Sequence, residues 1–154
     1  MLKLKNVSAK NFMSVGAQTQ AVNLNTGELT LVLGHNLDQG GDGSRNGTGK
    51  TTIVNALSYA LYGEALTNIK RDNLINKTNG KQMMVTVEFE KDGVDYRIER
   101  GRKPNVLRLF TDGEENKDDD DAQGDSRETQ KFIEKIIGFP HEMFKQLIAL
   151  NTYT

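Results

Sequence analysis

The chain has 154 residues, a formal net charge of −1 and no cysteine. The length favours one domain with its own core, the lack of cysteine excludes disulfides and thiolate metal sites, and the near-neutral charge gives no overall basic character of a nucleic-acid-binding domain. Neither an apolar run of membrane-spanning length nor a signal-peptide pattern is found, so we expect a cytoplasmic protein with no membrane partner.

Three strands are predicted before the first helix. Residues 2–12 alternate between apolar and polar side chains, which is typical of a strand. Residues 21–24 form a second short candidate. Residues 29–34, "LTLVLG", are a continuous apolar run that ends in glycine, as in a buried strand of a parallel or mixed sheet. Residues 35–49 have the composition of a loop.

A helix is predicted over residues 51–62, followed by Gly63 as a C-terminal stop. The apolar positions of this segment recur at the spacing of one helix face: Ile53, Val54, Leu57, Ala60 and Leu61. The local order is therefore strand, glycine-rich loop and helix.

The second half of the chain predicts antiparallel strands at about 83–111. Alternating residues flank a "KDG" turn and form a hairpin, and residues 105–110 form a further strand. Residues 112–125 form an acidic, solvated loop. Helices are expected over 126–147, the first beginning at a capping box from Asp125 and the second near Pro140. The apolar "LIAL" that follows suggests the start of a strand.

The segment "NGTGKTT" has the chemistry of a phosphate-binding loop. Its residues are Asn46, Gly47, Thr48, Gly49, Lys50, Thr51 and Thr52. Backbone N–H groups of a glycine-rich turn and of the following helix converge on an anion. Lys50 is expected to reach the β- and γ-phosphates of ATP, and the Thr51 hydroxyl to bind Mg²⁺.

The start of this loop is ambiguous, because the G-x-x-x-x-G-K-[ST] pattern requires a glycine at the position of Ser44. In one interpretation "SRNGTGKT" forms the loop, and residues 37–45 are an extension on its upstream rim. In the other, "LGHN" starts a loop that spans 34–52 and carries an insertion. Because Asn46 already adjoins Gly47, the first interpretation is favoured.

The combination of "KNFMSVG", "NALSYALYG" and "RGRKPN" around this loop resembles the SMC- and SbcC-like DNA-repair ATPases, a family that includes the large subunits of phage recombination endonucleases. The resemblance spans essentially the whole chain. It implies an α/β P-loop fold of the ABC-ATPase head type, with a mixed or antiparallel sheet around the P-loop helix. The implied cofactors are ATP and Mg²⁺.

The family's heads have two lobes separated by a coiled coil. Residues 1–154 match the N-terminal lobe, and the sequence contains no heptad run, signature motif or strand ending in Asp-Glu. We therefore expect a fragment that binds nucleotide weakly and hydrolyses almost none. The implied partners are the C-terminal lobe, a second ATPase head that forms a homodimer on ATP binding, a nuclease subunit and DNA.

Several residues outside the loop have two interpretations. By family resemblance Asn11 and Ser14 lie near the base or ribose, but they also suit a turn between strands. Gln146 resembles the family's Mg²⁺- and γ-phosphate-sensing glutamine, whereas alignment on Phe144 places that position nearer Thr152 and leaves Gln146 on a helix surface.

The local basic cluster Arg100, Arg102 and Lys103 suits either DNA phosphates or solvated loop charge. Two other functions compete with the family assignment. A complete small P-loop kinase or GTPase is disfavoured, because the predicted antiparallel hairpin interrupts the alternating parallel topology of kinases and no guanine-reading motif is present. A non-hydrolysing DNA-binding or interaction module is disfavoured by the near-neutral charge.

Overall fold

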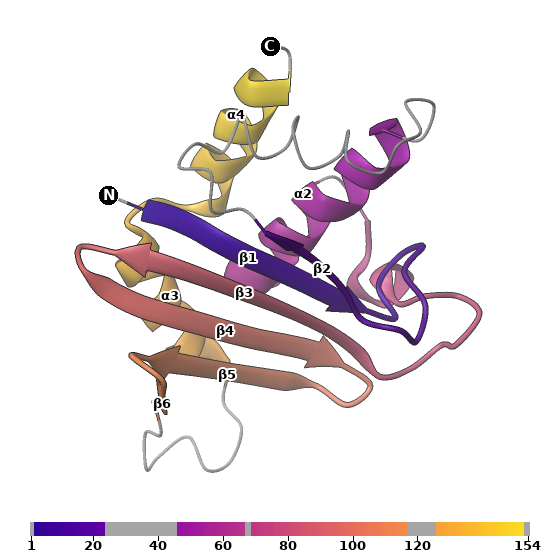
Figure 1. Cartoon of the computed structure of the whole chain (residues 1–154), viewed down its shortest axis with the longest axis horizontal. Helices are drawn as coiled ribbons and strands as arrows, with labels where there is room; N and C mark the ends of the chain where they lie inside the picture. The colour runs from indigo at the N-terminus through magenta and orange to yellow at the C-terminus, as the bar shows by residue number, and fades with distance from the viewer. Residues whose placement is uncertain (1, 24–45, 67–68, 117–125, 153–154) are drawn as a thin grey trace.

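The computed structural model describes residues 2–23, 46–66, 69–116 and 126–152 (Figure 1). The predicted strand at 29–34, the loop extension at 37–45 and most of the predicted acidic loop lie outside these residues. The described part is an α/β unit in which helices cover one face of an antiparallel sheet.

The sheet has the order β2-β1-β3-β4-β5-β6, and every neighbouring pair is antiparallel. The strands are β1 (Leu2–Lys10), β2 (Gln20–Asn23), β3 (Met83–Lys91), β4 (Val94–Arg102), β5 (Val106–Thr111) and β6 (Glu114–Glu115). The predicted hairpin is the β3–β4 pair, whose Asp92-Gly93 turn has φ angles of 53° and 84°. Positive φ at both turn residues matches the twist of the flanking strands, and Asp-Gly is among the pairs that adopt it readily.

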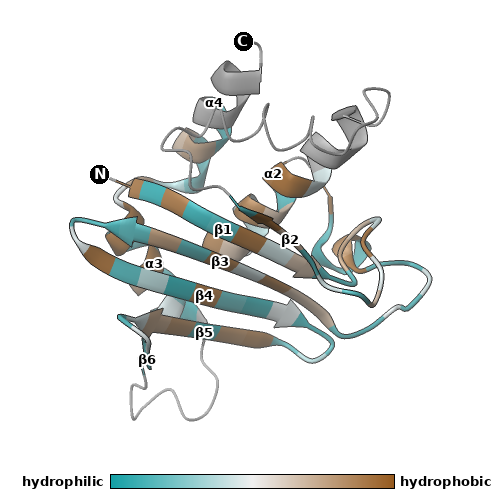
Figure 2. Cartoon of the chain, viewed as in Figure 1, coloured by the Kyte–Doolittle hydropathy of each residue, from teal (hydrophilic) through white to brown (hydrophobic). Residues whose placement is uncertain are grey.

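Alternation along the strands separates a buried face from a polar one. Val87 pairs with Val7 on one side and Ile98 on the other, and all three are buried. Glu88, the next residue of β3, points to the opposite face and pairs with Arg97. The bands of alternating hydropathy along the strands are visible in Figure 2.

The helices are α2 (Asn46–Tyr62), α3 (Ser126–Ile137) and α4 (His141–Thr152), with a short 3₁₀ turn, η2 (Arg71–Leu74). α2 packs on β1, β3 and β4, α3 packs on β5, and both α3 and α4 contact α2. Lys91 at the end of β3 donates to the Ile137 carbonyl oxygen at 2.8 Å, which fixes the end of α3 to the sheet.

The C-terminal segment corrects one prediction. Residues 147–150, "LIAL", belong to α4 and not to a strand. A four-residue apolar run has no distinctive period, and the preceding turn, in which the Met143 and Phe144 N–H groups bond to the Pro140 carbonyl, has already started a helix.

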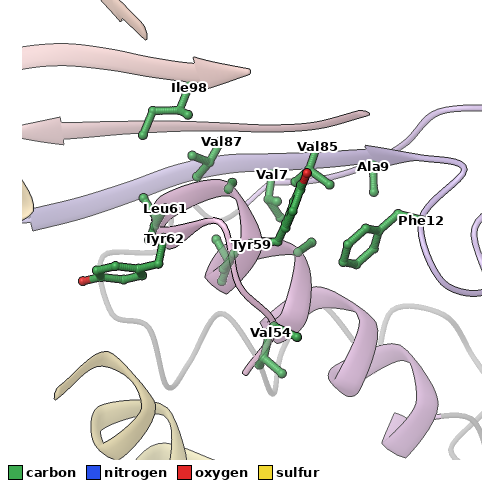
Figure 3. Packing of buried hydrophobic residues seen from close by; sticks show 14 of the residues in the cluster. Val7, Ala9, Phe12, Val54, Tyr59, Leu61, Tyr62, Val85, Val87 and Ile98 are labelled. Atoms are coloured by element: carbon green, nitrogen blue, oxygen red, sulfur yellow. The ribbon is translucent and has the colours of Figure 1, made fainter. Parts of the chain in front are cut away.

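Helix α2 is nearly surrounded. From Val54 to Gly63 its residues are buried, although only one face was predicted to be apolar. Figure 3 shows Tyr59 and Leu61 beneath sheet residues that include Val7, Val85 and Ile98. A helix that is buried all round needs small or internally bonded residues on its other sides, and Ala56, Ser58 and Ala60 meet this need.

Candidate functional site

The seven predicted phosphate-binding residues, 46–52, lie consecutively in the first turns of α2. The helix begins at Asn46, five residues before the predicted start at Thr51. Glycine lowers intrinsic helix propensity, but the N–H groups of a first turn have no partner within the helix, so Asn46 and Gly47 are tolerated there. Thr52 is buried, with 9% of the residue exposed.

The N-terminus of α2 suits an anion in two respects. Unpaired N–H groups and the positive end of the helix dipole gather at this terminus. The first turn contains no acidic residue that would repel a phosphate.

The downstream end of α2 is fixed by partly buried hydrogen bonds. Ser58 donates to the Glu64 carbonyl oxygen at 2.7 Å. The Leu66 N–H donates to the Asn55 side-chain oxygen at 2.8 Å, and the Tyr62 hydroxyl donates to the Phe139 carbonyl at 2.9 Å. These bonds bind the helix to the segments that follow it and to the α3–α4 connection.

His141, the first residue of α4, lies between two polar groups near the C-terminal end of α2. Its Nε2 is 2.7 Å from the Ser58 hydroxyl oxygen, and its Nδ1 is 3.4 Å from a Glu64 carboxylate oxygen. Because the Ser58 hydroxyl proton is donated to the Glu64 carbonyl, Nε2 is the donor in the His141–Ser58 contact. Burial lowers the pKa of His141, and the Glu64 charge opposes this shift.

The predicted basic cluster is not one surface. Arg100 is buried, with 9% exposed, and contacts the end of α2. Arg102 donates to Asp72 at 2.6 Å, whereas Lys103 is exposed. Arg100 is therefore removed from the candidate DNA contacts. Tyr96 and Ile98 lie on the inner face of β4, and alternation along the strand places Arg100 on the same face. This alternation was the signal in the sequence for the burial of Arg100.

Asn11 is buried in the loop after β1, where its side chain forms hydrogen bonds that hold the loop. It is 3% exposed, its side-chain oxygen accepts from Asn79 at 2.7 Å, and its side-chain nitrogen donates to the Gln82 carbonyl at 3.3 Å. Its φ is 52°. The turn interpretation of Asn11 is thus supported, while Ser14 is exposed.

Gln146 is exposed on α4, as expected for a helix-surface residue, and Thr152 is the last residue of that helix. Among the described residues, no group of three or more His, Asp or Glu side chains is arranged to hold a metal ion. None of the helices in those same ranges is long and apolar enough to cross a membrane.

Comparison with known proteins gives this arrangement a family. A family model for an AAA domain matches residues 6–152. Exonuclease subunit 2 of Enterobacteria phage T4 is 34% identical over 150 residues, which are 97% of this chain and 24% of that protein. The exonuclease subunit 2 of Escherichia phage RB69 is 33% identical with the same coverage.

More distant matches agree. A DNA double-strand break repair Rad50 ATPase of Methanococcus maripaludis is 26% identical over 150 residues, 96% of this chain and 13% of that protein. A solved structure from work on ATP-driven dimerization and DNA-stimulated activation of SMC ATPases superposes with a TM-score of 0.51 at 15% identity, covering 88% of this chain and 77% of that one.

The chain spans about a quarter of the length of the phage relatives. The structural match shows a shared α/β fold, consistent with the P-loop ABC-ATPase head predicted from the sequence. The chain belongs to the AAA-domain family, and its predicted resemblance to the SMC- and SbcC-like DNA-repair ATPases is confirmed.

Proposed function

We propose that residues 46–52 form the phosphate-binding part of an ATP site. The observation that carries the proposal is the composition and burial of helix α2. Its first turn is free of acidic residues, and its body is buried from Val54 onward. The helix is thus a fixed support whose positive end suits phosphate.

Within this site Lys50 stabilises charge on the β- and γ-phosphates, and Thr51 provides the hydroxyl that binds Mg²⁺. Asn46, Gly47, Thr48, Gly49 and Thr52 complete the turn, mainly through backbone N–H groups. The bound ion would help to neutralise the phosphates; the chain's own contribution is to position and bind them.

We further propose that residues 1–154 form the N-terminal lobe of an ATPase subunit that acts with a nuclease in the repair or recombination of DNA double-strand breaks. The names of the relatives, exonuclease subunits and a Rad50 ATPase, support this proposal. The partners are a C-terminal lobe, a second ATPase head that associates on ATP binding, a nuclease subunit and DNA. Without a C-terminal lobe, this chain binds ATP weakly and turns over almost none.

Fluorescent ATP analogue titration of the purified chain tests the site. Lys50→Ala is expected to weaken binding on the order of 10- to 100-fold, because charge-assisted hydrogen bonds contribute about 1.5–3 kcal/mol. Thr51→Ala should abolish the difference between the ATP-analogue affinity measured with Mg²⁺ and that measured with EDTA. Lys77→Ala, at an exposed position after η2, is the matched lysine control and should bind as the parent chain does.

Two results would contradict this reasoning. Equal affinity of the parent and Lys50→Ala chains would remove the phosphate site from residues 46–52. Appreciable ATP turnover by the chain alone, abolished by Lys50→Ala, would show that it is a complete enzyme and not one lobe.

A further inference from the structure

Arg100 is a buried cation with an unusual set of partners. It lies on the inner face of β4 and is 9% exposed, and it forms no ion pair within the described ranges. A buried charge is costly unless other groups compensate it. Burial lowers the pKa of Arg100 to about 10, so the guanidinium remains charged at neutral pH.

The compensation comes from the C-terminal end of α2. Arg100 Nε donates to the Ala60 carbonyl oxygen at 3.2 Å, and the guanidinium carbon lies 5.9 Å from the centroid of the Tyr59 ring. The last carbonyls of a helix lack partners within it and carry the negative end of its dipole. α2 has no basic residue in its own last turn, so β4 supplies the cation that this terminus favours.

Gln130 of α3 completes the contact. Its side-chain oxygen accepts from Arg100 Nη2, and its side-chain nitrogen donates to the Leu61 carbonyl oxygen at 3.1 Å. The Gly63 N–H bonds to the carbonyl of Tyr59 at 2.7 Å. Successive terminal carbonyls of α2 therefore receive donors from the following chain, from β4 and from α3.

Gly63 leaves the space that this contact needs. A Cβ at Gly63 would lie 2.6 Å from Arg100 Nη1, and the glycine has a φ of +78°. The turn after α2 thus accommodates the guanidinium as well as ending the helix.

From these contacts we infer that Arg100 and Gln130 are positioning residues for the phosphate-binding turn. They fix the C-terminal end of α2 to β4 and α3, and the helix, 17 residues and therefore about 25 Å long, transmits that position to residues 46–52. When the end is released, α2 occupies its binding position for a smaller fraction of the time, and the apparent affinity falls by that fraction. This inference rests on the proposed ATP site.

The test compares ATP-analogue affinity and amide hydrogen exchange in the 154-residue chain. Arg100→Met and Gln130→Met remove the hydrogen bonds and keep side-chain bulk. Each should weaken binding about three- to tenfold and increase exchange along α2. Arg100→Lys keeps the charge without the planar fork, and its affinity should lie between those of the parent chain and Arg100→Met. Because the two residues act as a unit, the double Met variant should be little weaker than either single variant.

Phe89→Leu is the control for general loss of stability. Phe89 is fully buried in β3 and stacks on Tyr96, with ring centroids 5.3 Å apart. It should lower the unfolding midpoint without changing affinity or α2 exchange at temperatures where the chain is folded. If Phe89→Leu weakened ATP binding as much as Arg100→Met at equal loss of stability, the positioning role would be refuted.

Hydrogen exchange separates this inference from the proposed function. If the parent chain bound no ATP, the proposed function would fail, but the exchange of α2 would still show whether Arg100 and Gln130 fix its C-terminal end. Faster exchange of α2 in Arg100→Met than in Phe89→Leu would support that role, and equal exchange would overturn it.

Discussion

Substitution of Asn11 separates two contributions to the stability of the loop after β1. Its side chain accepts from Asn79 and donates to the Gln82 carbonyl, and its backbone has a φ of 52°. Both the side-chain hydrogen bonds and the positive φ of Asn11 therefore contribute to the stability of the loop. Asn11→Gly and Asn11→Ala both remove the side-chain bonds. Only Asn11→Ala also places a side chain on a backbone of positive φ.

Loss of the side-chain hydrogen bonds should cost about 1 kcal/mol in either variant. The cost is small because Asn79 and Gln82 are exposed, so their freed polar groups can form hydrogen bonds to water. Alanine adds about 1–2 kcal/mol for a left-handed backbone. Glycine adopts that conformation freely but adds about 0.4–1 kcal/mol by enlarging the unfolded ensemble. The free energy of unfolding should therefore fall by about 1.5–2 kcal/mol for Asn11→Gly and about 2–3 kcal/mol for Asn11→Ala.

Guanidinium titration at 25 °C measures these losses, and far-UV circular dichroism is the suitable probe because the chain has no tryptophan. Gln18→Ala, at an exposed position of the same loop, should match the parent chain. The expected order reverses the usual preference for alanine over glycine. An Asn11→Ala variant as stable as Asn11→Gly, with equal denaturant slopes, would refute the backbone contribution.

Two further predictions concern the end of α2. Gly63→Ala should lower the unfolding midpoint by several degrees more than Gly93→Ala, because both positions have positive φ but only the added methyl at Gly63 meets Arg100; equal shifts would contradict this. Because burial lowers the pKa of His141 below its usual 6.5, the stability from its neutral form is present above that value and is lost as pH falls through the folded-state pKa. Thermal unfolding at pH 7.5 and pH 5 should therefore show a smaller change in midpoint for His141→Gln than for the parent chain, and an unchanged difference would refute the assignment to His141.

The sequence predicted best what depends on neighbouring residues. The β3–β4 hairpin follows from strict alternation around Asp92-Gly93, and the end of α2 from Gly63. The "LIAL" strand was wrong because four apolar residues fit either element, and the turn begun at Pro140 decided between them.

Contacts between distant segments could not be predicted in this way. Ser58 and His141 are 83 residues apart, and neither neighbourhood carries a signal that pairs them. Gln130 likewise has an ordinary helical setting in sequence, and only the packing of α3 on α2 brings it to Leu61. For the candidate site, the spacing of the motif at residues 46–52 predicts phosphate binding, and this stays a prediction. The contacts that hold α2 in place come from tertiary structure and carry no signal in the motif.

The place of β1 between β2 and β3 has a consequence for synthesis of the chain. Leu4 pairs with Phe89, so one edge of β1 waits for a partner more than 80 residues downstream. At translation rates of 5–20 residues per second, that delay is on the order of 4–16 s. Until then β1 can pair only with β2, and the edge that β3 later occupies stays open, whereas β3, β4 and β5 pair locally as they emerge. Nascent chains that misassemble should therefore do so through the N-terminal strand.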